Sequence, residues 1–257
     1  MYSFLHDLLK DRKGADIFTL FSGWHFLYIV LTALSATFLL LIYSNKNKDD
    51  KFRLLKTLVN ISFGLYILDI FLMPLAYNEI DIEKLPFHAC TAMCVACFLS
   101  YYVKPLEHVR SSLVLLGFIS NFVYLVYPAG VMWHATHPIS YRVIQTLTFH
   151  AIMTVYCLLA LIYEERKSPT KAIASDLSVI STMTLWALIG NYVYNGTYDG
   201  YSHFFNWFFV VRDPFYALPE NVAPFVMPFI NIALFFSVGL IVRTVIFIIK
   251  SKIKRSK

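Results

Sequence analysis

Seven long apolar runs constrain this chain more than any other feature of its sequence. Each run is close to the roughly 20 residues that a helix needs to cross a hydrocarbon core of ~30 Å. Because lipid offers no hydrogen bonds to the backbone, such segments form helices in a bilayer. The sequence therefore predicts an all-α, polytopic membrane helical bundle with about seven transmembrane helices. The runs are 25–43, 54–76, 85–103, 111–127, 143–163, 172–194 and 223–249.

The placement of basic residues predicts how the chain is oriented. The net charge is +6, but Lys and Arg lie in short loops between apolar runs and in the tail 250–257. That distribution is typical of a multi-pass membrane protein rather than of a nucleic-acid-binding protein. With the N-terminus outside, the outer segments hold six of the 22 Lys and Arg, and the inner segments with the adjoining span ends hold the other 16. This split favours an N-out, C-in orientation, with 250–257 as a basic cytoplasmic tail.

We expect residues 1–257 to form a single integral membrane domain. The first 20 residues lack an apolar core long enough for a cleavable signal peptide, and 1–24 is expected to be an interfacial segment. Residues 195–222 form a long outer loop containing the aromatic run 201–209. That run is too short to span, so we expect it to be interfacial or re-entrant and to cover the outer mouth of the bundle.

Polar residues inside the predicted spans mark a candidate site. Such residues are costly in a bilayer and are commonly functional. Five spans carry one within ~5–11 Å of the outer boundary, at 1.5 Å of rise per residue. We therefore expect a site in the outer half of the bundle. The five residues are Asp69, His88, Asn121, His150 and Asn191.

Helical phase and burial refine these candidates. Thr146, His150, Thr154 and Cys157 fall on one stripe that should face the protein interior. Asp69 and His150 should each have a partner, because burial of either one alone is expensive.

In the third span, His88 and Thr91 share a face, whereas Cys90 lies about 200° from His88. A Cys90 nucleophile would need a base from another helix, and His150 is the natural candidate. The four cysteines are expected to be small buried hydrophobes, and His25 is expected at the interface or in a loop.

The string Leu85-Pro86-Phe87-His88-Ala89-Cys90 resembles the YwaF family of bacterial integral membrane proteins, which carries a Leu-Pro-Leu-His-Leu-Cys type string there. His150 within an apolar run, Asn191-Tyr192 and the outer loop with Asp213-Pro214-Phe215-Tyr216 resemble other family positions. The YwaF family is distantly similar to a eukaryotic transmembrane acyltransferase of ether phospholipids and to the androgen-induced lipid hydrolases, which use an intramembrane threonine and histidine.

This resemblance implies acyl chemistry on lipids and carries over to His88 and His150. The chain departs from the eukaryotic acyltransferase in one respect. That enzyme has its cysteine directly before the histidine, where this chain has Phe87.

The hypothesis from sequence is an intramembrane lipid acyltransferase or hydrolase without a cofactor, with membrane lipids as its partners. His150 would be the general base, Cys90 or Thr91 the nucleophile, and Asp69 or His88 the orienting group. The residues expected to bind substrate are Asn121, Asn191 and Tyr192. Two alternatives remain open: a non-enzymatic transporter or ligand-binding membrane protein that uses the same residues, and a metal site built from Asp69, His88 and His150.

The orientation can be tested with topology reporters. A reporter fused after Lys257 should report the cytoplasm, and one inserted in the 128–142 loop should report the outside, because basic residues favour the inner face. A C-terminal reporter found outside would contradict both the seven-span count and the orientation.

Overall fold

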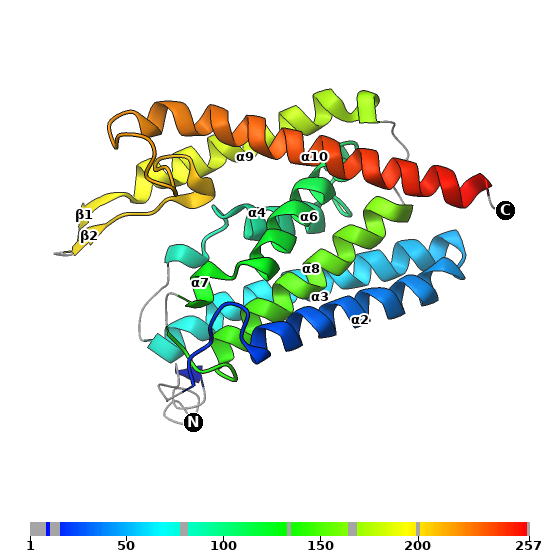
Figure 1. Ribbon diagram of the computed structural model, residues 1–257, viewed down its shortest axis with the longest axis horizontal. Coiled ribbons are helices and arrows are strands. Elements are labelled where there is room, and N and C mark those ends of the chain that lie inside the picture. The colour runs from blue at the N-terminus through cyan, green and yellow to red at the C-terminus, as the bar shows by residue number, and fades with distance from the viewer. Residues whose placement is uncertain are drawn as a thin grey trace. The chain divides into compact units, whose positions relative to one another are not determined.

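The computed structural model describes residues 9–10, 16–77, 82–132, 135–163, 169–198 and 201–255. Much of the predicted interfacial segment 1–24, and the last two residues of the basic tail, lie outside this range. Within it, six helices are long and apolar enough to cross a membrane. The chain is therefore a multi-pass membrane protein of the all-α class, as predicted (Figure 1). The helices that supply these six spans are α2 (Gly23–Ser44), α3 (Lys48–Tyr77), α6 (Arg110–Val126) with α7 (Ala129–Met132), α8 (Tyr141–Tyr163), α9 (Pro169–Tyr194) and α10 (Ala223–Arg255).

The third predicted span is a shorter helix than expected. In place of a helix over 85–103, the structure has α4 (Ala89–Leu99), whose 11 residues cover only about 16 Å. Pro86 favours an extended or turn conformation before it, the Phe87 N–H turns back to Leu85 O at 2.7 Å, and His88 is extended. The helix ends at Ser100, whose carbonyl accepts from Arg110 at 2.6 Å. Short helices η1 (Ile82–Lys84) and α5 (Lys104–Glu107) flank it. The seven-span count and the orientation stay predictions.

The chain divides into two compact units. The first contains Met1–Lys84 and Ser120–Ala160, and the second contains Leu85–Ile119 and Leu161–Lys257. The expectation of a single membrane domain stays a prediction.

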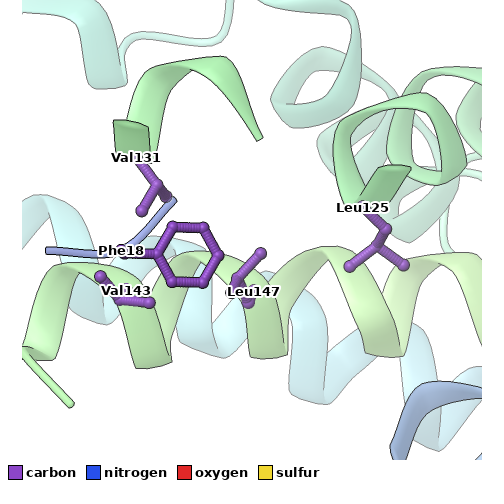
Figure 2. Close-up of a cluster of buried hydrophobic side chains, with 5 residues drawn as sticks. All are labelled: Phe18, Leu125, Val131, Val143 and Leu147. Carbon is purple, nitrogen blue, oxygen red and sulfur yellow. The ribbon is translucent and has the colours of Figure 1, made fainter. Parts of the chain in front are cut away.

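In the first unit, the segment before α2 packs into the hydrophobic core. Phe18 lies among Leu125, Val131, Val143 and Leu147 (Figure 2), and its N–H donates to Thr136 O at 2.9 Å. Together these contacts hold the N-terminal segment to the helices of its own unit.

His25 is also buried in this unit, with no exposed surface, and it lies in the first turn of α2 rather than in a loop. Its expected position at the membrane interface stays a prediction. Its Nδ1 accepts from the Phe21 N–H at 3.0 Å. Because a backbone N–H can only donate, the ring proton sits on Nε2, which donates to Leu125 O at 2.8 Å. The ring therefore links the start of α2 to the end of α6.

In the second unit, α9 and α10 pack against each other and against the connection between them. That connection begins with an antiparallel hairpin of β1 (Gly196–Tyr198) and β2 (Tyr201–His203), followed by η2 (Trp207–Phe209) (Figure 1). The aromatic run is thus no spanning helix, as expected. Its role in covering the mouth of the bundle stays a prediction.

Four asparagines hold the backbone of this connection. Asn191 donates to Trp207 O and accepts from its N–H, at 3.1 and 3.0 Å, and Asn195 makes the same pair of bonds with Phe205. The remaining two, Asn206 and Asn231, bond the backbone at Val211, Arg212, Phe208 and Phe209. Carboxamides suit this role because each combines a donor and an acceptor, as the backbone does.

Aromatic rings stack between α9 and the residues that lead into α4. Phe87 lies 4.9 Å from the Trp186 ring and 4.8 Å from the Trp207 ring, nearly parallel to both. It fits against α9 because position 190 is a glycine, and a Cβ there would overlap the Phe87 ring.

Substitution of Gly190 tests this packing. We expect Gly190→Ala to lower thermal stability in detergent, because overpacking costs about 1–3 kcal/mol while the gain in helix propensity returns at most about 1 kcal/mol. Gly64→Ala is the matched control, since nothing lies within 4 Å of its added Cβ; it should leave stability unchanged or raise it. Equal melting temperatures for the two variants would show that the Phe87 contact is unimportant.

Candidate functional site

His150 is the most strongly constrained candidate in the first unit. It is 4% exposed, and its ring stacks on Tyr124 with 3.8 Å between centroids and 11° between planes. Its Nδ1 lies 2.7 Å from Thr146 O. A carbonyl only accepts, so Nδ1 carries a proton, and in the neutral ring Nε2 is then the basic nitrogen. The expectation that a buried His150 has a partner is confirmed.

The stripe around His150 faces the protein interior, as predicted. Thr146, Thr154 and Cys157 are all buried with it. Thr154 Oγ1 has no hydrogen-bond partner among the described residues. On α6, Asn121 is fully buried. Its role in substrate binding stays a prediction.

Asp69 is paired, as expected, and its partner is Lys84. The Lys84 amine lies 2.8 Å from Asp69 Oδ2, with 21% and 4% of the two side chains exposed. Tyr66 Oη donates to Lys84 O at 2.8 Å, which fixes the backbone that carries the amine. The position at His150 Nδ1 that an orienting carboxylate would take is filled by the Thr146 carbonyl.

The other candidates lie at the start of α4, in the second unit. His88 is the N-cap residue, but its side chain makes no capping bond; its ring meets that of Trp207 edge to face at 6.3 Å. Cys90 and Thr91 occupy the first turn. The Thr91 hydroxyl donates to His88 O at 3.1 Å, whereas the Cys90 thiol belongs to no disulfide and is only half-buried. Cys94, Cys97 and Cys157 are buried thiols, as expected, so the expectation of burial is confirmed for these three and not for Cys90.

Asn191 and Tyr192 have contrasting surroundings. The Asn191 carboxamide bonds Ala187 O and the Trp207 backbone, so its visible role is to hold the loop. Tyr192 is 90% exposed. Their predicted role in substrate binding is not tested by these contacts.

The connection between α9 and α10 contains a second organised turn, at Asp213. Its carboxylate accepts from the N–H groups of Phe215, Ala217 and Leu218 at 2.8–3.0 Å. The Phe215 N–H above all, with those of Leu218 and Ala217, lowers the pKa of Asp213 against the opposing effect of burial. The turn therefore keeps its ionised carboxylate until the pH falls below the ordinary range for aspartate.

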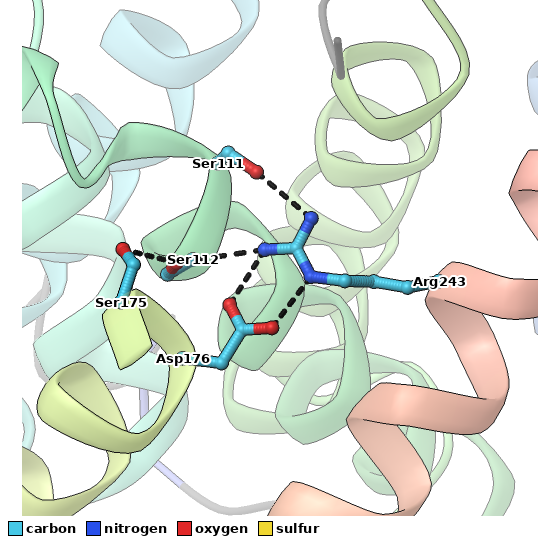
Figure 3. A network of polar contacts seen from close by, with 5 residues as sticks. All are labelled: Ser111, Ser112, Ser175, Asp176 and Arg243. Atoms are coloured by element: carbon cyan, nitrogen blue, oxygen red, sulfur yellow. Dashed lines mark hydrogen bonds and ion pairs between the residues drawn. The ribbon is translucent and has the colours of Figure 1, made fainter. Parts of the chain in front are cut away.

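A buried ion pair in the second unit was missed from sequence. Arg243 on α10 forms two bonds of 2.6 Å with Asp176 on α9, and its Nη1 donates to Ser111 on α6 at 2.9 Å (Figure 3). Ser112 extends the network to Ser175 at 2.7 Å. The available signal was one acid and one base inside neighbouring predicted spans, near the end assigned to the cytoplasm.

No group of three or more His, Cys, Asp or Glu side chains is placed to hold a metal ion in the part of the chain that the structure describes. The alternative of a metal site built from Asp69, His88 and His150 therefore has no support there. The structure describes Asp69, Asn121 and His150 within the first unit, and His88, Cys90, Thr91, Asn191 and Tyr192 within the second.

A family model matches residues 20–248, which is most of the chain and includes all of these candidates. The chain belongs to the TMEM164 family. This membership agrees with the multi-pass membrane architecture, while the more specific resemblance to the YwaF family stays a prediction. No curated protein and no solved structure matches the chain.

The ion pair between Arg243 and Asp176 should be important for stability. Asp176→Ala leaves a buried guanidinium unpaired, which should cost about 3–5 kcal/mol, whereas the double change Asp176→Leu with Arg243→Met should recover much of that loss. Thermal melts in detergent measure both.

Arg212 and Glu220 supply the control, because their 3.5 Å pair has 36% and 81% of its side chains exposed. Glu220→Gln should change stability by less than about 1 kcal/mol. A similar small effect for Asp176→Ala would contradict the role assigned to the buried pair.

Proposed function

We propose that this protein catalyses acyl transfer or acyl hydrolysis on membrane lipids, with His150 as the general base. The observation that carries the proposal is the bond between His150 Nδ1 and Thr146 O at 2.7 Å. It fixes the ring orientation and leaves the basic electron pair on Nε2. Histidine bases in acyl transfer are held in this way, through a hydrogen bond from the opposite ring nitrogen.

The surroundings of His150 suit proton transfer in a dry site. The ring stacks on Tyr124 and is almost fully buried, which holds it in one orientation. Polar residues inside membrane helices are costly, so a buried histidine on a spanning helix calls for a function. The YwaF resemblance, with its distant link to lipid acyltransferases and hydrolases, supports an ester lipid as the substrate.

The chemistry requires one proton to move in each direction. Nε2 takes the proton from an attacking water or lipid hydroxyl as its oxygen bonds to the ester carbonyl carbon. When the tetrahedral intermediate collapses, the original ester C–O bond breaks and the histidinium returns the proton to the departing lysolipid oxygen. The products are a free fatty acid in hydrolysis and a new ester in transfer.

Cys90 and Thr91 remain the candidates for a covalent route. The Thr91 hydroxyl is bonded to His88 O, and a thiol is intrinsically the stronger nucleophile of the two groups, so Cys90 is the better candidate. In that route the Cys90 sulfur would bond to the ester carbonyl carbon, the ester C–O bond would break and the lysolipid alcohol would leave with a proton. Water or a lipid hydroxyl would then displace the thiol from the acyl-thioester.

Substitution of His150 tests the proposal. His150→Phe keeps a ring against Tyr124 and should reduce acyl release or exchange from labelled phospholipid by roughly 10²–10⁴-fold, without loss of the folded protein. His25→Gln is the matched control, since it alters a second buried histidine that only bonds backbone. It should lower stability and keep the specific activity of the folded fraction.

Cys90→Ser and Thr91→Val then separate the covalent and direct routes, with a labelled acyl-protein as the marker. Wild-type protein without acyl release or exchange would reject the enzymatic proposal and favour the transporter or ligand-binding alternative. Full activity in His150→Phe would reject His150 as the base.

A further inference from the structure

We propose that the indole N–H of Trp207 binds the carbonyl oxygen of a lipid ester beside the N-terminus of α4. This inference rests on the proposed function in taking an ester lipid as the substrate. It adds a hydrogen-bond donor from the outer loop, a residue that the sequence did not single out.

The Trp207 indole N–H is a buried donor without an acceptor among the described residues. The side chain is 1% exposed, and its Nε1 has no hydrogen-bond partner among the described residues. Trp186 offers a direct contrast, because its Nε1 donates to Pro86 O at 2.7 Å. Buried donors are almost always satisfied, and one that is not calls for an explanation such as a missing ligand.

The fold fixes Trp207 firmly while leaving this donor unused. Asn191 bonds both its N–H and its carbonyl, and the ring is stacked between Phe205 at 4.5 Å and Phe87 at 4.8 Å. The next two residues, Phe208 and Phe209, have left-handed backbones with φ of 56° and 53°. Residues other than glycine rarely adopt this backbone conformation. Strained backbone of this kind is concentrated at functional sites, where the surrounding structure maintains it.

Trp207 lies against the residues that lead into α4. Its ring contacts those of Phe87 and His88, directly before the first turn with Cys90 and Thr91. The His88 side chain does not cap this helix, so the first turn presents N–H groups and a partial positive charge. An indole N–H and the N–H groups of a helix N-terminus are both donors of the kind that stabilises a carbonyl oxygen as it gains negative charge.

The surroundings favour an ester carbonyl over a charged acceptor. The rings packed around Trp207 belong to Phe87, His88, Tyr194 and Phe205. A charged phosphate or carboxylate would lose far more hydration than a neutral carbonyl on entering such aromatic surroundings. An ester carbonyl needs only a neutral donor, which the indole supplies.

Indole NMR tests binding without requiring turnover. The protein, ¹⁵N-labelled in its four tryptophans, would be placed in nanodiscs of dioleoyl phosphatidylcholine or of the matching diether lipid, which lacks ester carbonyls. The Trp207 indole proton, assigned with Trp207→Phe, should lie further downfield in the ester lipid. That of Trp186 should be the same in both. A Trp207 signal that is identical in the two lipids overturns the proposal, whether or not the protein is active.

Two variants separate a substrate contact from a structural one. Trp207→Phe removes a donor that bonds no described residue, so its cost in thermal stability should be limited to the lost packing of the larger ring, while acyl turnover falls by roughly 10²–10³-fold. Trp186→Phe removes the bond to Pro86 and should lower stability without changing the specific turnover of the folded protein. If Trp207→Phe keeps full turnover, the indole N–H does not act on the substrate. If the NMR shift appears without any acyl chemistry, the carbonyl site holds and the proposed reaction fails.

Discussion

A bilayer gives polar groups almost no solvation, and the internal organisation of this protein depends on that constraint. Each buried charge must find its counter-charge within the protein. Asp69 meets Lys84 in the first unit, and Asp176 meets Arg243 in the second. The second pair also engages the serines of α6, so one guanidinium joins three helices. Neither pair could be left half-formed without a buried charge and its desolvation cost.

The same constraint explains the asparagines of the connection between α9 and α10. A hairpin and a three-residue turn cannot satisfy their own backbone as a helix does. Asn191, Asn195, Asn206 and Asn231 supply the missing donors and acceptors. Because these bonds fix the backbone of the connection, its aromatic rings can stack. Phe87 packs directly against Gly190, where a Cβ would overlap its ring. The connection between α9 and α10 is thus an ordered part of the second unit.

Against this background of satisfied groups, two side chains indicate chemistry. His150 has one ring nitrogen committed to a carbonyl of its own helix, which sets the other as a base. Trp207 is held by two backbone bonds to Asn191 and by ring stacking, while its indole N–H bonds no described residue. One residue suits the movement of a proton and the other suits an electron-rich oxygen. Acyl chemistry on an ester uses a base and a donor of these two kinds, and in this member of the TMEM164 family each is proposed within its own unit.

The sequence by itself determined the membrane class, the long helices, the burial of three of the four cysteines and the need for partners at Asp69 and His150, because these follow from local hydrophobicity and period. The sequence overestimated the length of α4. The turn at Phe87 delays the start of this helix, and its last carbonyls are followed by Ser100, which bonds Arg110. Only the tertiary structure decided that His25 is buried, that Lys84 pairs with Asp69, and that Arg243 reaches Asp176. These contacts are between residues that are separated in the chain. A hydrophobic pattern indicates which side chains are buried, but it does not indicate which buried side chains contact one another.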